Sequence, residues 1–217
     1  MNIPTRLLRL PAALALLTAV AAAHAAPPAG DPRALVEDSY VRIRAVSERA
    51  TSQAELTRDV IAILGRLIDW SAFSRLTLTP PVWDALTPAR RARFEAAYEA
   101  YIIERYAQRF KPGTGFRVAF RGPTELAEDR SSAIVRTTVT VPSGEREVGA
   151  DVDYAFVASR RGDESVWLIE DIVTDTVSRA HTYRPIFTRI YRERGFDALI
   201  EAIEKNSKRD RAGKGGD

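Results

Sequence analysis

Apolar side chains recur every three or four residues through the first half of the chain, which is the spacing of one face of an α-helix. The first such stretch follows Asp31 and Pro32, residue types that favour the cap and the first turn of a helix. The second follows Ser52, with Glu55 three residues later as in a capping box. The pattern predicts two helices with apolar faces formed by Leu35, Val36, Tyr40, Ile43 and Val46, and by Leu56, Val60, Ile63, Leu64 and Leu67.

A longer helix is predicted to begin at Thr87 and Pro88 and to end before Pro112. Residues 69–86, which precede it, are interrupted by two adjacent prolines and hold more large apolar groups than a loop needs. We therefore expect short helices and turns in that segment. The apolar side of the long helix carries Phe94, Ala97, Tyr98, Tyr101, Ile102, Tyr106 and Phe110.

The repeat changes to every second residue from Phe116 onward, which is typical of β-strands. Strands are expected at 116–120, 134–141, 148–158 and 166–177. The connections after the second and third strands are short and contain glycine, which favours antiparallel hairpins. Helical spacing returns on both sides of Gly195, at 183–194 and 196–203. This order predicts an α+β domain, with N-terminal and C-terminal helices packed on an antiparallel sheet of about four strands.

The two ends of the chain differ from the middle. Arg6 and Arg9 precede an apolar run that is short for a membrane span of about 20 residues, and Ala23-His24-Ala25 has the small residues that signal peptidase recognises. We expect residues 1–25 to be a cleaved secretory signal peptide, with an uncleaved anchor as the alternative. Residues 26–204 are then a single domain, and the charged, glycine-rich residues 205–217 are expected to be disordered.

Charge and cysteine content narrow the function classes. The net charge of +3 falls to +1 without Arg6 and Arg9, so the chain lacks the basic excess that nucleic acid binding requires. There is no cysteine, so an exported form must be held together by core burial alone.

Few residues offer catalytic chemistry. His181 lies near Asp175 and Ser178, but no glycine-rich nucleophile elbow surrounds that serine. Glu170 and Asp171 are adjacent carboxylates, but strand alternation sends them to opposite faces, which disfavours a cation site. No phosphate-binding glycine loop is present. We therefore expect no catalytic residue, no metal and no cofactor.

Two blocks of sequence resemble a known family. The first holds Trp70, Phe73 and the run Thr87-Pro88-Ala89-Arg90-Arg91-Ala92-Arg93-Phe94; the second holds Trp167, Asp171, Val177-Ser178 and Tyr183-Arg184-Pro185-Ile186-Phe187. Together they are similar to the toluene-tolerance/MlaC family of periplasmic phospholipid-binding proteins, over roughly residues 33–204. The chain departs from the family pattern at Thr176, where the family usually has glycine, and at residues 74–78.

This resemblance implies helices that cover a curved sheet and enclose an apolar pocket for lipid tails. It implies a soluble periplasmic carrier that shuttles phospholipid between the outer and inner membranes, with no enzymatic activity. The partners implied are an inner-membrane ABC-type lipid transporter complex and an outer-membrane lipoprotein complex. The family has a branch associated with hopanoids, so a hopanoid or other lipid is an alternative ligand. A periplasmic adaptor or chaperone that binds polypeptide is an alternative of another class.

On this interpretation the tail pocket is lined by apolar residues of the long helix, the third and fourth strands and the closing helix. The residues expected there are Tyr98, Ile102, Tyr106, Val148, Val152, Tyr154, Phe156, Ile169, Val173, Tyr183 and Phe187, with Ile169 and Val173 expected at its floor. Arg184 is a candidate for the phosphate of a headgroup, with a surface ion pair as the alternative.

Overall fold

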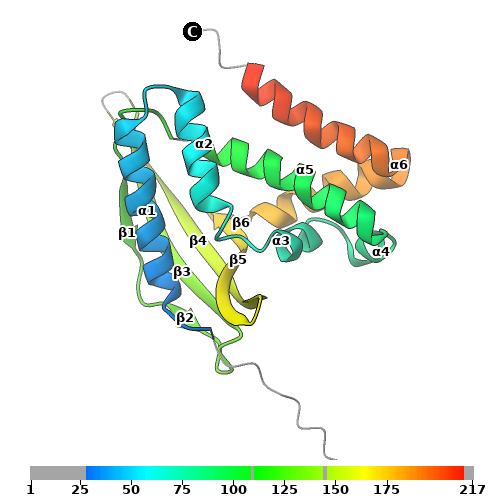
Figure 1. The fold of residues 1–217 in the computed structure, drawn as a ribbon, viewed down its shortest axis with the longest axis horizontal. Coiled ribbons are helices and arrows are strands. Elements are labelled where there is room, and N and C mark those ends of the chain that lie inside the picture. The colour runs from blue at the N-terminus through cyan, green and yellow to red at the C-terminus, as the bar shows by residue number, and fades with distance from the viewer. Residues whose placement is uncertain (1–27, 109, 144–145, 213–217) are drawn as a thin grey trace, which may run out of the picture.

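A computed structural model describes residues 28–108, 110–143 and 146–212 (Figure 1). The expected signal peptide, residues 1–25, and the last five residues of the expected disordered tail lie outside this part of the chain. The elements are α1 (Pro32–Arg49), α2 (Gln53–Leu64), α3 (Trp70–Leu76), α4 (Pro80–Asp84), α5 (Pro88–Ala107), β1 (Arg117–Phe120), β2 (Glu125–Leu126), β3 (Ser132–Ser143), β4 (Arg146–Arg161), β5 (Glu164–Thr174), β6 (Val177–Ser178) and α6 (Arg179–Ala212). No helix in the described ranges is long and apolar enough to cross a membrane.

The helices begin at the predicted caps. The side chain of Asp31 accepts a hydrogen bond from the backbone N–H of Arg33, and that of Thr87 accepts one from the N–H of Arg90. Ser52 accepts one from the N–H of Glu55, and the Glu55 carboxylate in turn accepts one from the N–H of Thr51. Each cap satisfies a backbone donor that the first turn of a helix leaves unpaired. Residues 69–86 form the two short helices α3 and α4, as expected.

The strands form one antiparallel sheet in the order β1-β3-β4-β5-β6, with β2 also paired to β3. The α+β prediction is confirmed. The sheet has six strands rather than about four, because the two-residue strands β2 and β6 add to the four long ones. Such short pairings give no alternating pattern that a sequence can display.

A β-bulge changes the alternation in β5. Ala155 of β4 pairs with Asp171, whereas the next residue, Phe156, pairs with Ile169, so Glu170 is an extra residue without a partner on β4. A bulge of this kind reverses which residues face which side of a sheet. Ile169 therefore shares a face with Phe156, but Val173 shares the opposite face with Asp153.

The molecule has two regions around a continuous apolar core (Figure 1). In the first, which we call the sheet lobe, α1 and α2 lie against the inner face of the sheet, the face that carries Val152, Tyr154 and Phe156. In the second, the helical lobe, α3, α4, α5 and α6 pack beside the β5 edge. The C-terminal end of α5 reaches back to the sheet lobe, where Tyr106 contacts its core.

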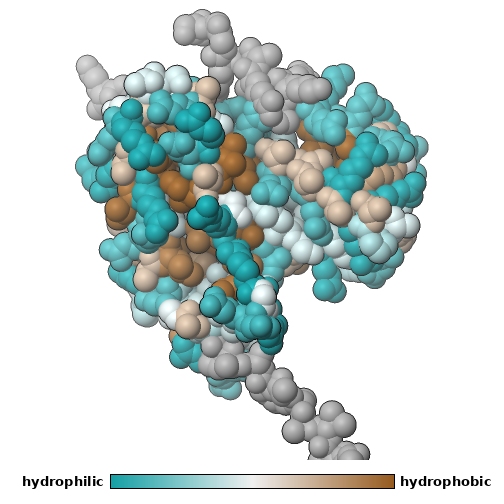
Figure 2. All heavy atoms as spheres, in the orientation of Figure 1, coloured by the Kyte–Doolittle hydropathy of each residue, from teal (hydrophilic) through white to brown (hydrophobic). Residues whose placement is uncertain are grey.

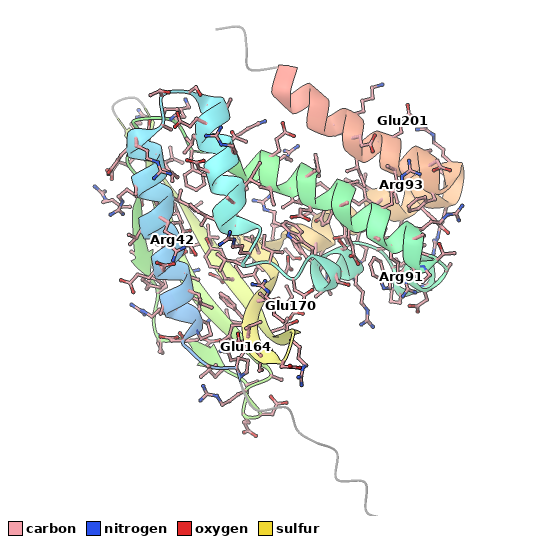
Figure 3. All side chains as sticks on the ribbon, viewed as in Figure 1. Arg42, Arg91, Arg93, Glu164, Glu170 and Glu201 are labelled. Atoms are coloured by element: carbon pink, nitrogen blue, oxygen red, sulfur yellow. The ribbon has the colours of Figure 1, made fainter. Side chains whose placement is uncertain are left out.

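The closing helix bends at Gly195, as the sequence predicts. Gly195 has φ 83°, a left-handed conformation that glycine adopts without strain. Beyond the bend, Asp197 forms an ion pair of 2.7 Å with Arg93 of α5. Arg93 is labelled in Figure 3, where α5 and α6 lie side by side. The helix continues from Lys205 to Ala212, where we expected no regular structure.

The chain between α2 and α3 extends the edge of the sheet. Ile68 forms a parallel bridge with Ile169, in which the N–H of Asp69 donates to the Ile169 carbonyl at 2.9 Å and the N–H of Ile169 donates to the Leu67 carbonyl at 2.7 Å. This bridge fixes Leu67 next to β5 and closes one side of the sheet lobe.

Candidate functional site

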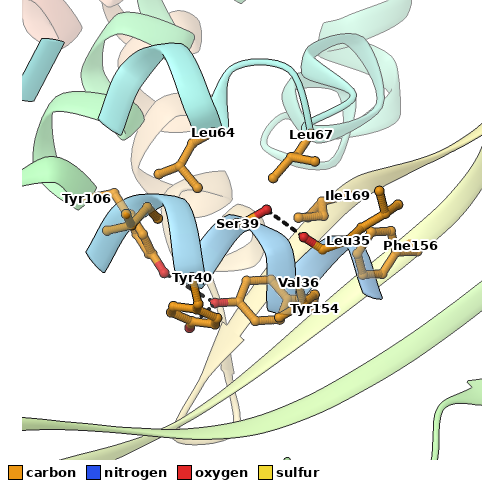
Figure 4. Close-up of a pocket in the computed structure, with 11 residues that line it drawn as sticks. Leu35, Val36, Ser39, Tyr40, Leu64, Leu67, Tyr106, Tyr154, Phe156 and Ile169 are labelled. Carbon is orange, nitrogen blue, oxygen red and sulfur yellow. Dashed lines mark hydrogen bonds between the residues drawn. The ribbon is translucent and has the colours of Figure 1, made fainter. Parts of the chain in front are cut away.

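A small cavity of about 20 Å³ lies between the inner face of the sheet and the helices α1 and α2 (Figure 4). Its wall is almost wholly apolar, and the polar atoms of its lining side chains are the hydroxyls of Ser39 and of three tyrosines. The Ser39 hydroxyl donates to the Leu35 carbonyl at 2.6 Å. The residues that line it are Leu35, Val36, Ser39, Tyr40, Ile43, Leu64, Leu67, Tyr106, Tyr154, Phe156 and Ile169. Space of this kind receives hydrocarbon without leaving a polar group unpaired.

Three tyrosine hydroxyls meet on one side of the cavity. The Tyr154 hydroxyl lies 2.5 Å from that of Tyr40 and 3.3 Å from that of Tyr106 (Figure 4). Burial raises the pKa of Tyr40 and of Tyr154 well above the ordinary value of a phenol. These two hydroxyls therefore stay protonated, and able to donate, throughout the neutral and mildly alkaline range.

An open groove of about 620 Å³ continues from the cavity along the same face of the sheet. Tyr106 lines both spaces, so it stands at their junction. The floor of the groove is apolar, and its rim carries polar and basic side chains from the end of α5. The groove residues are Arg105, Tyr106, Gln108, Phe110, Lys111, Val139, Val141, Val148, Ala150 and Val152.

The strand register makes the cavity and the groove one surface. Val148, Ala150, Val152, Tyr154 and Phe156 alternate along β4 and so point to one side. Their partners on β3 include Val141, Val139 and Val135, which also belong to that side. α1 and α2 cover the Phe156 end of this surface, whereas Val148 at the other end is 54% exposed. A large apolar side chain that is exposed at the end of a buried row marks a surface for an apolar ligand or partner.

Apolar side chains also remain visible from outside along the seam between α1 and α2 (Figure 2). Val41 on α1 is 60% exposed, and Ile61 on α2 is 39% exposed. Single exposed apolar side chains of this kind are common on protein surfaces and do not measure how α1 and α2 pack on the sheet.

The structure separates the residues predicted for the tail pocket into four groups. Tyr106, Tyr154, Phe156 and Ile169 line the cavity, and Val148 and Val152 line the groove. Tyr98, Tyr183 and Phe187 belong instead to the aromatic core of the helical lobe, and Ile102 packs half-buried against the core. Val173 lies on the outer face of the sheet because of the bulge at Glu170.

Arg184 does not lie at the mouth of the cavity. Its Nε donates a hydrogen bond of 2.8 Å to the carbonyl of Leu76, and its side chain borders a surface hollow on the helical lobe together with His181 and Arg192. The headgroup role predicted for it has no geometric link to the tail cavity.

Sequence reasoning missed the contribution of the first two helices. Leu35, Val36, Tyr40 and Ile43 of α1, with Leu64, form much of the cavity wall. Their helical spacing predicts an apolar face but does not distinguish the wall of a cavity from a packed core. One signal was available: Ser39 and Tyr40 place two hydroxyls on an otherwise apolar helical stripe.

Ser178 and Asp175, which lie near His181 in the sequence, have structural roles. Ser178 donates its hydroxyl hydrogen to Asp171 and accepts a hydrogen bond from the backbone N–H of His181, which caps the start of α6. Asp175 accepts a hydrogen bond from the N–H of Asp151. No group of three or more potential metal ligands occurs among the described residues.

The model of the MlaC family, described as MlaC protein, matches residues 34–205. The chain belongs to the MlaC family. No curated protein matches it. A solved structure with a similar fold is the phospholipid-binding protein from Ralstonia solanacearum, in complex with a phospholipid. This MlaC-family chain and that protein superpose with a TM-score of 0.69 at 18% identity, over 83% of this chain and 98% of the other.

Proposed function

We propose that this chain is a soluble periplasmic carrier that holds the acyl tails of a phospholipid against the inner face of its sheet. The observation that carries the proposal is the apolar row along β4, which lines first the small cavity and then the open groove. Membership of the MlaC family supports it, as does the shared fold with a protein described as phospholipid-binding. The signal-like residues 1–25 support the periplasmic location.

Such a carrier is needed because lipid tails leave a membrane slowly. Each methylene transferred from water into an apolar site contributes about 0.8 kcal/mol, so a tail of roughly 16 carbons contributes on the order of 10 kcal/mol. A protein that offers apolar contacts of similar strength removes most of that barrier. This work requires no bond to be made or broken, so we propose a binding protein and not an enzyme.

The cavity must enlarge to take a whole lipid. Its volume of about 20 Å³ holds little more than one water molecule, whereas small-molecule sites have about 300–1,000 Å³, and a lipid with two tails is larger than most such ligands. Two polar contacts on the β1 side hold α1: Arg44 donates to the Phe116 carbonyl and Arg33 to the Gly122 carbonyl, both at 3.2 Å. We propose that α2 moves away from β5 as the tails enter, while the Tyr40–Tyr154 hydrogen bond keeps α1 on β4.

Transfer between membranes completes the proposal. By family resemblance, the chain would exchange lipid with an outer-membrane lipoprotein complex and with an inner-membrane ABC-type transporter complex. The direction of net transfer would be set by these partners, because a carrier that only binds has no source of free energy of its own.

The test is the lipid that accompanies the purified protein. We expect native mass spectrometry to detect a bound phospholipid, identified by lipid analysis of an organic extract. Tyr154→Arg should remove most of it, because a charge in the cavity has no partner. The matched control is Ala155→Arg, which places the same charge on the other face of β4, opposite Asp171. Leu64→Arg, at a half-buried lining position, serves if Tyr154→Arg does not fold.

The outcomes separate the candidate functions. An extract without lipid, from protein that binds unfolded polypeptide instead, would support an adaptor or chaperone. A polycyclic hydrocarbon in the extract would replace phospholipid by a hopanoid-type ligand. Wild-type lipid content in folded Tyr154→Arg protein would show that the tails do not occupy this cavity.

A further inference from the structure

The hydroxyls of Tyr40, Tyr154 and Tyr106 form a hydrogen-bonded series at the point where the small cavity meets the open groove. Tyr154 is in the middle, Tyr40 is buried on α1, and half-buried Tyr106 borders both spaces. Polar groups in a wall built to receive hydrocarbon reduce its affinity for hydrocarbon, so their presence at this one place calls for a ligand that uses them.

The three tyrosine hydroxyls carry one hydrogen more than the hydrogen bonds between them use. Three hydroxyls carry three hydrogens, and the two hydrogen bonds between them take up two. If Tyr40 donates to Tyr154 and Tyr154 donates to Tyr106, the remaining hydrogen is on Tyr106, the member that a ligand can reach. In the opposite direction the remaining hydrogen is on Tyr40, which has Thr137 as a further hydrogen-bond partner. An acceptor beside Tyr106 favours the first direction, and each bond in such a series strengthens the next.

The chemistry of the wall also has an order. Beyond the tyrosines on one side the lining is apolar, and on the other side the groove rim carries the exposed side chains of Arg105 and Lys111. The sequence along the wall is therefore apolar, then hydrogen-bond donor, then cationic. An acylated glycerophospholipid has the matching order, with a hydrocarbon tail, then an ester carbonyl that accepts hydrogen bonds, then an anionic phosphate.

We propose that Tyr106, supported by Tyr154 and Tyr40, donates a hydrogen bond to the ester carbonyl of a bound acyl chain. The tail of that chain lies in the cavity, and the glycerol and phosphate lie in the groove beside Arg105 and Lys111. The three tyrosines thus fix how deeply the lipid inserts and select ester-linked lipids. This inference rests on the proposed function, because it requires a phospholipid in this site.

The test compares two phospholipids that differ only in the carbonyl: dipalmitoyl phosphatidylglycerol and its ether-linked dihexadecyl analogue, measured by competition for the same site. We expect the wild-type chain to prefer the ester by about two- to tenfold, the effect of one neutral hydrogen bond. Tyr106→Phe should bind the two lipids with equal affinity. Tyr191→Phe, the same change at a half-buried tyrosine of α6 outside the cavity lining, should keep the preference.

Each outcome has one meaning. Equal binding of the two lipids by the wild-type chain would overturn this inference and leave the carrier proposal intact. A preference that persists in Tyr106→Phe would also overturn it, since the donor would then be elsewhere. Failure of both lipids to bind would instead contradict the proposed function. Tyr154→Phe, which breaks the relay from Tyr40, should give a smaller loss of preference and serves as the second variant if Tyr106→Phe is unstable.

Discussion

The two lobes are built from the same residue types but pack differently. In the helical lobe, Phe94 stacks on Tyr98 with ring centroids 5.8 Å apart, and Phe187 meets both rings edge-on at 6.1 and 5.9 Å. Tyr98 has no exposed surface. In the sheet lobe, Tyr154 and Phe156 are equally well covered by α1 and α2, yet a cavity remains beside them.

This difference in packing indicates that the two lobes differ in how easily they deform. Aromatic rings that fill the space between helices give the helical lobe a single close-packed arrangement, which resists deformation. In the sheet lobe, Tyr40 of α1 contacts the rings of Phe116 and Tyr154, but α2 has no aromatic residue and borders the small cavity. This helix can therefore move without the loss of a ring contact. We infer that the helical lobe is the rigid support and that the sheet lobe is the part that accepts a ligand.

The largest effect is expected from opening a space in the filled lobe. Phe94→Ala should lower the free energy of unfolding by about 3–5 kcal/mol, because Phe94 is fully buried among Trp83, Tyr98 and Phe187. Leu67→Ala should cost less than about 2 kcal/mol, because Leu67 is half-buried and already borders a cavity. Denaturant unfolding of both variants checks this order. Equal losses would show that the two lobes are packed alike.

A smaller effect is expected from ligand binding, and only in one lobe. A phospholipid at 100 times its Kd stabilises the bound state by about 2.7 kcal/mol, which slows amide exchange by about 100-fold where exchange requires the site to open. We expect this protection in α1, α2 and β4 and little change in α3 or in the part of α6 before Gly195. Hydrogen exchange with mass spectrometry measures it, with Tyr154→Arg as the control. Equal protection of both lobes would contradict the inference that the sheet lobe alone accepts the ligand.

The smallest effect concerns the bulge between the lobes. Burial, with the nearby carboxylates of Asp171 and Asp69, raises the pKa of Glu170. A carboxyl group whose pKa is raised by folding reduces stability as the pH rises from its unfolded value, about 4.3, through the folded value. Glu170→Gln should therefore stabilise the protein by a few tenths of a kcal/mol at neutral pH and have no effect below pH 4.

The control for this last prediction is Glu164→Gln, on the same strand. Glu164 and Glu170 both lie on β5 (Figure 3), but Glu164 is exposed. Glu164→Gln should leave the free energy of unfolding unchanged at both pH 4 and pH 7.5 in denaturant unfolding experiments. A gain from Glu170→Gln that is the same at pH 4 and pH 7.5 would show that charge is not its cause.

Local chemistry explains what the sequence predicted correctly. The caps at Asp31, Ser52 and Thr87 depend on neighbours within three residues, so they are visible in the chain itself. Helical spacing on both sides of Gly195 predicts two helices that meet there, and the left-handed backbone conformation of this glycine forms the bend between them. The α+β order followed from the change of period near residue 116 in the same way.

Tertiary packing explains what the sequence did not reveal. The stripe on α5 contains Tyr98 and Tyr106, but the two side chains lie in different lobes, and periodicity names a face without naming its neighbour. The bulge at Glu170 moved Val173 to the outer face, and one unpaired residue leaves no mark in an alternating pattern. Whether a core is filled or hollow depends on such contacts.

The bridge between Ile68 and Ile169 has a consequence for solubility. An open strand edge presents free N–H and C=O groups that attract strands of other molecules, and this is a particular hazard for a protein with greasy inner surfaces. Residues 67–69 cover the β5 edge at Ile169, and β6 covers it at Val173 and Thr174. The apolar interior of the sheet lobe therefore lies next to a strand edge that is partly closed to pairing with another molecule.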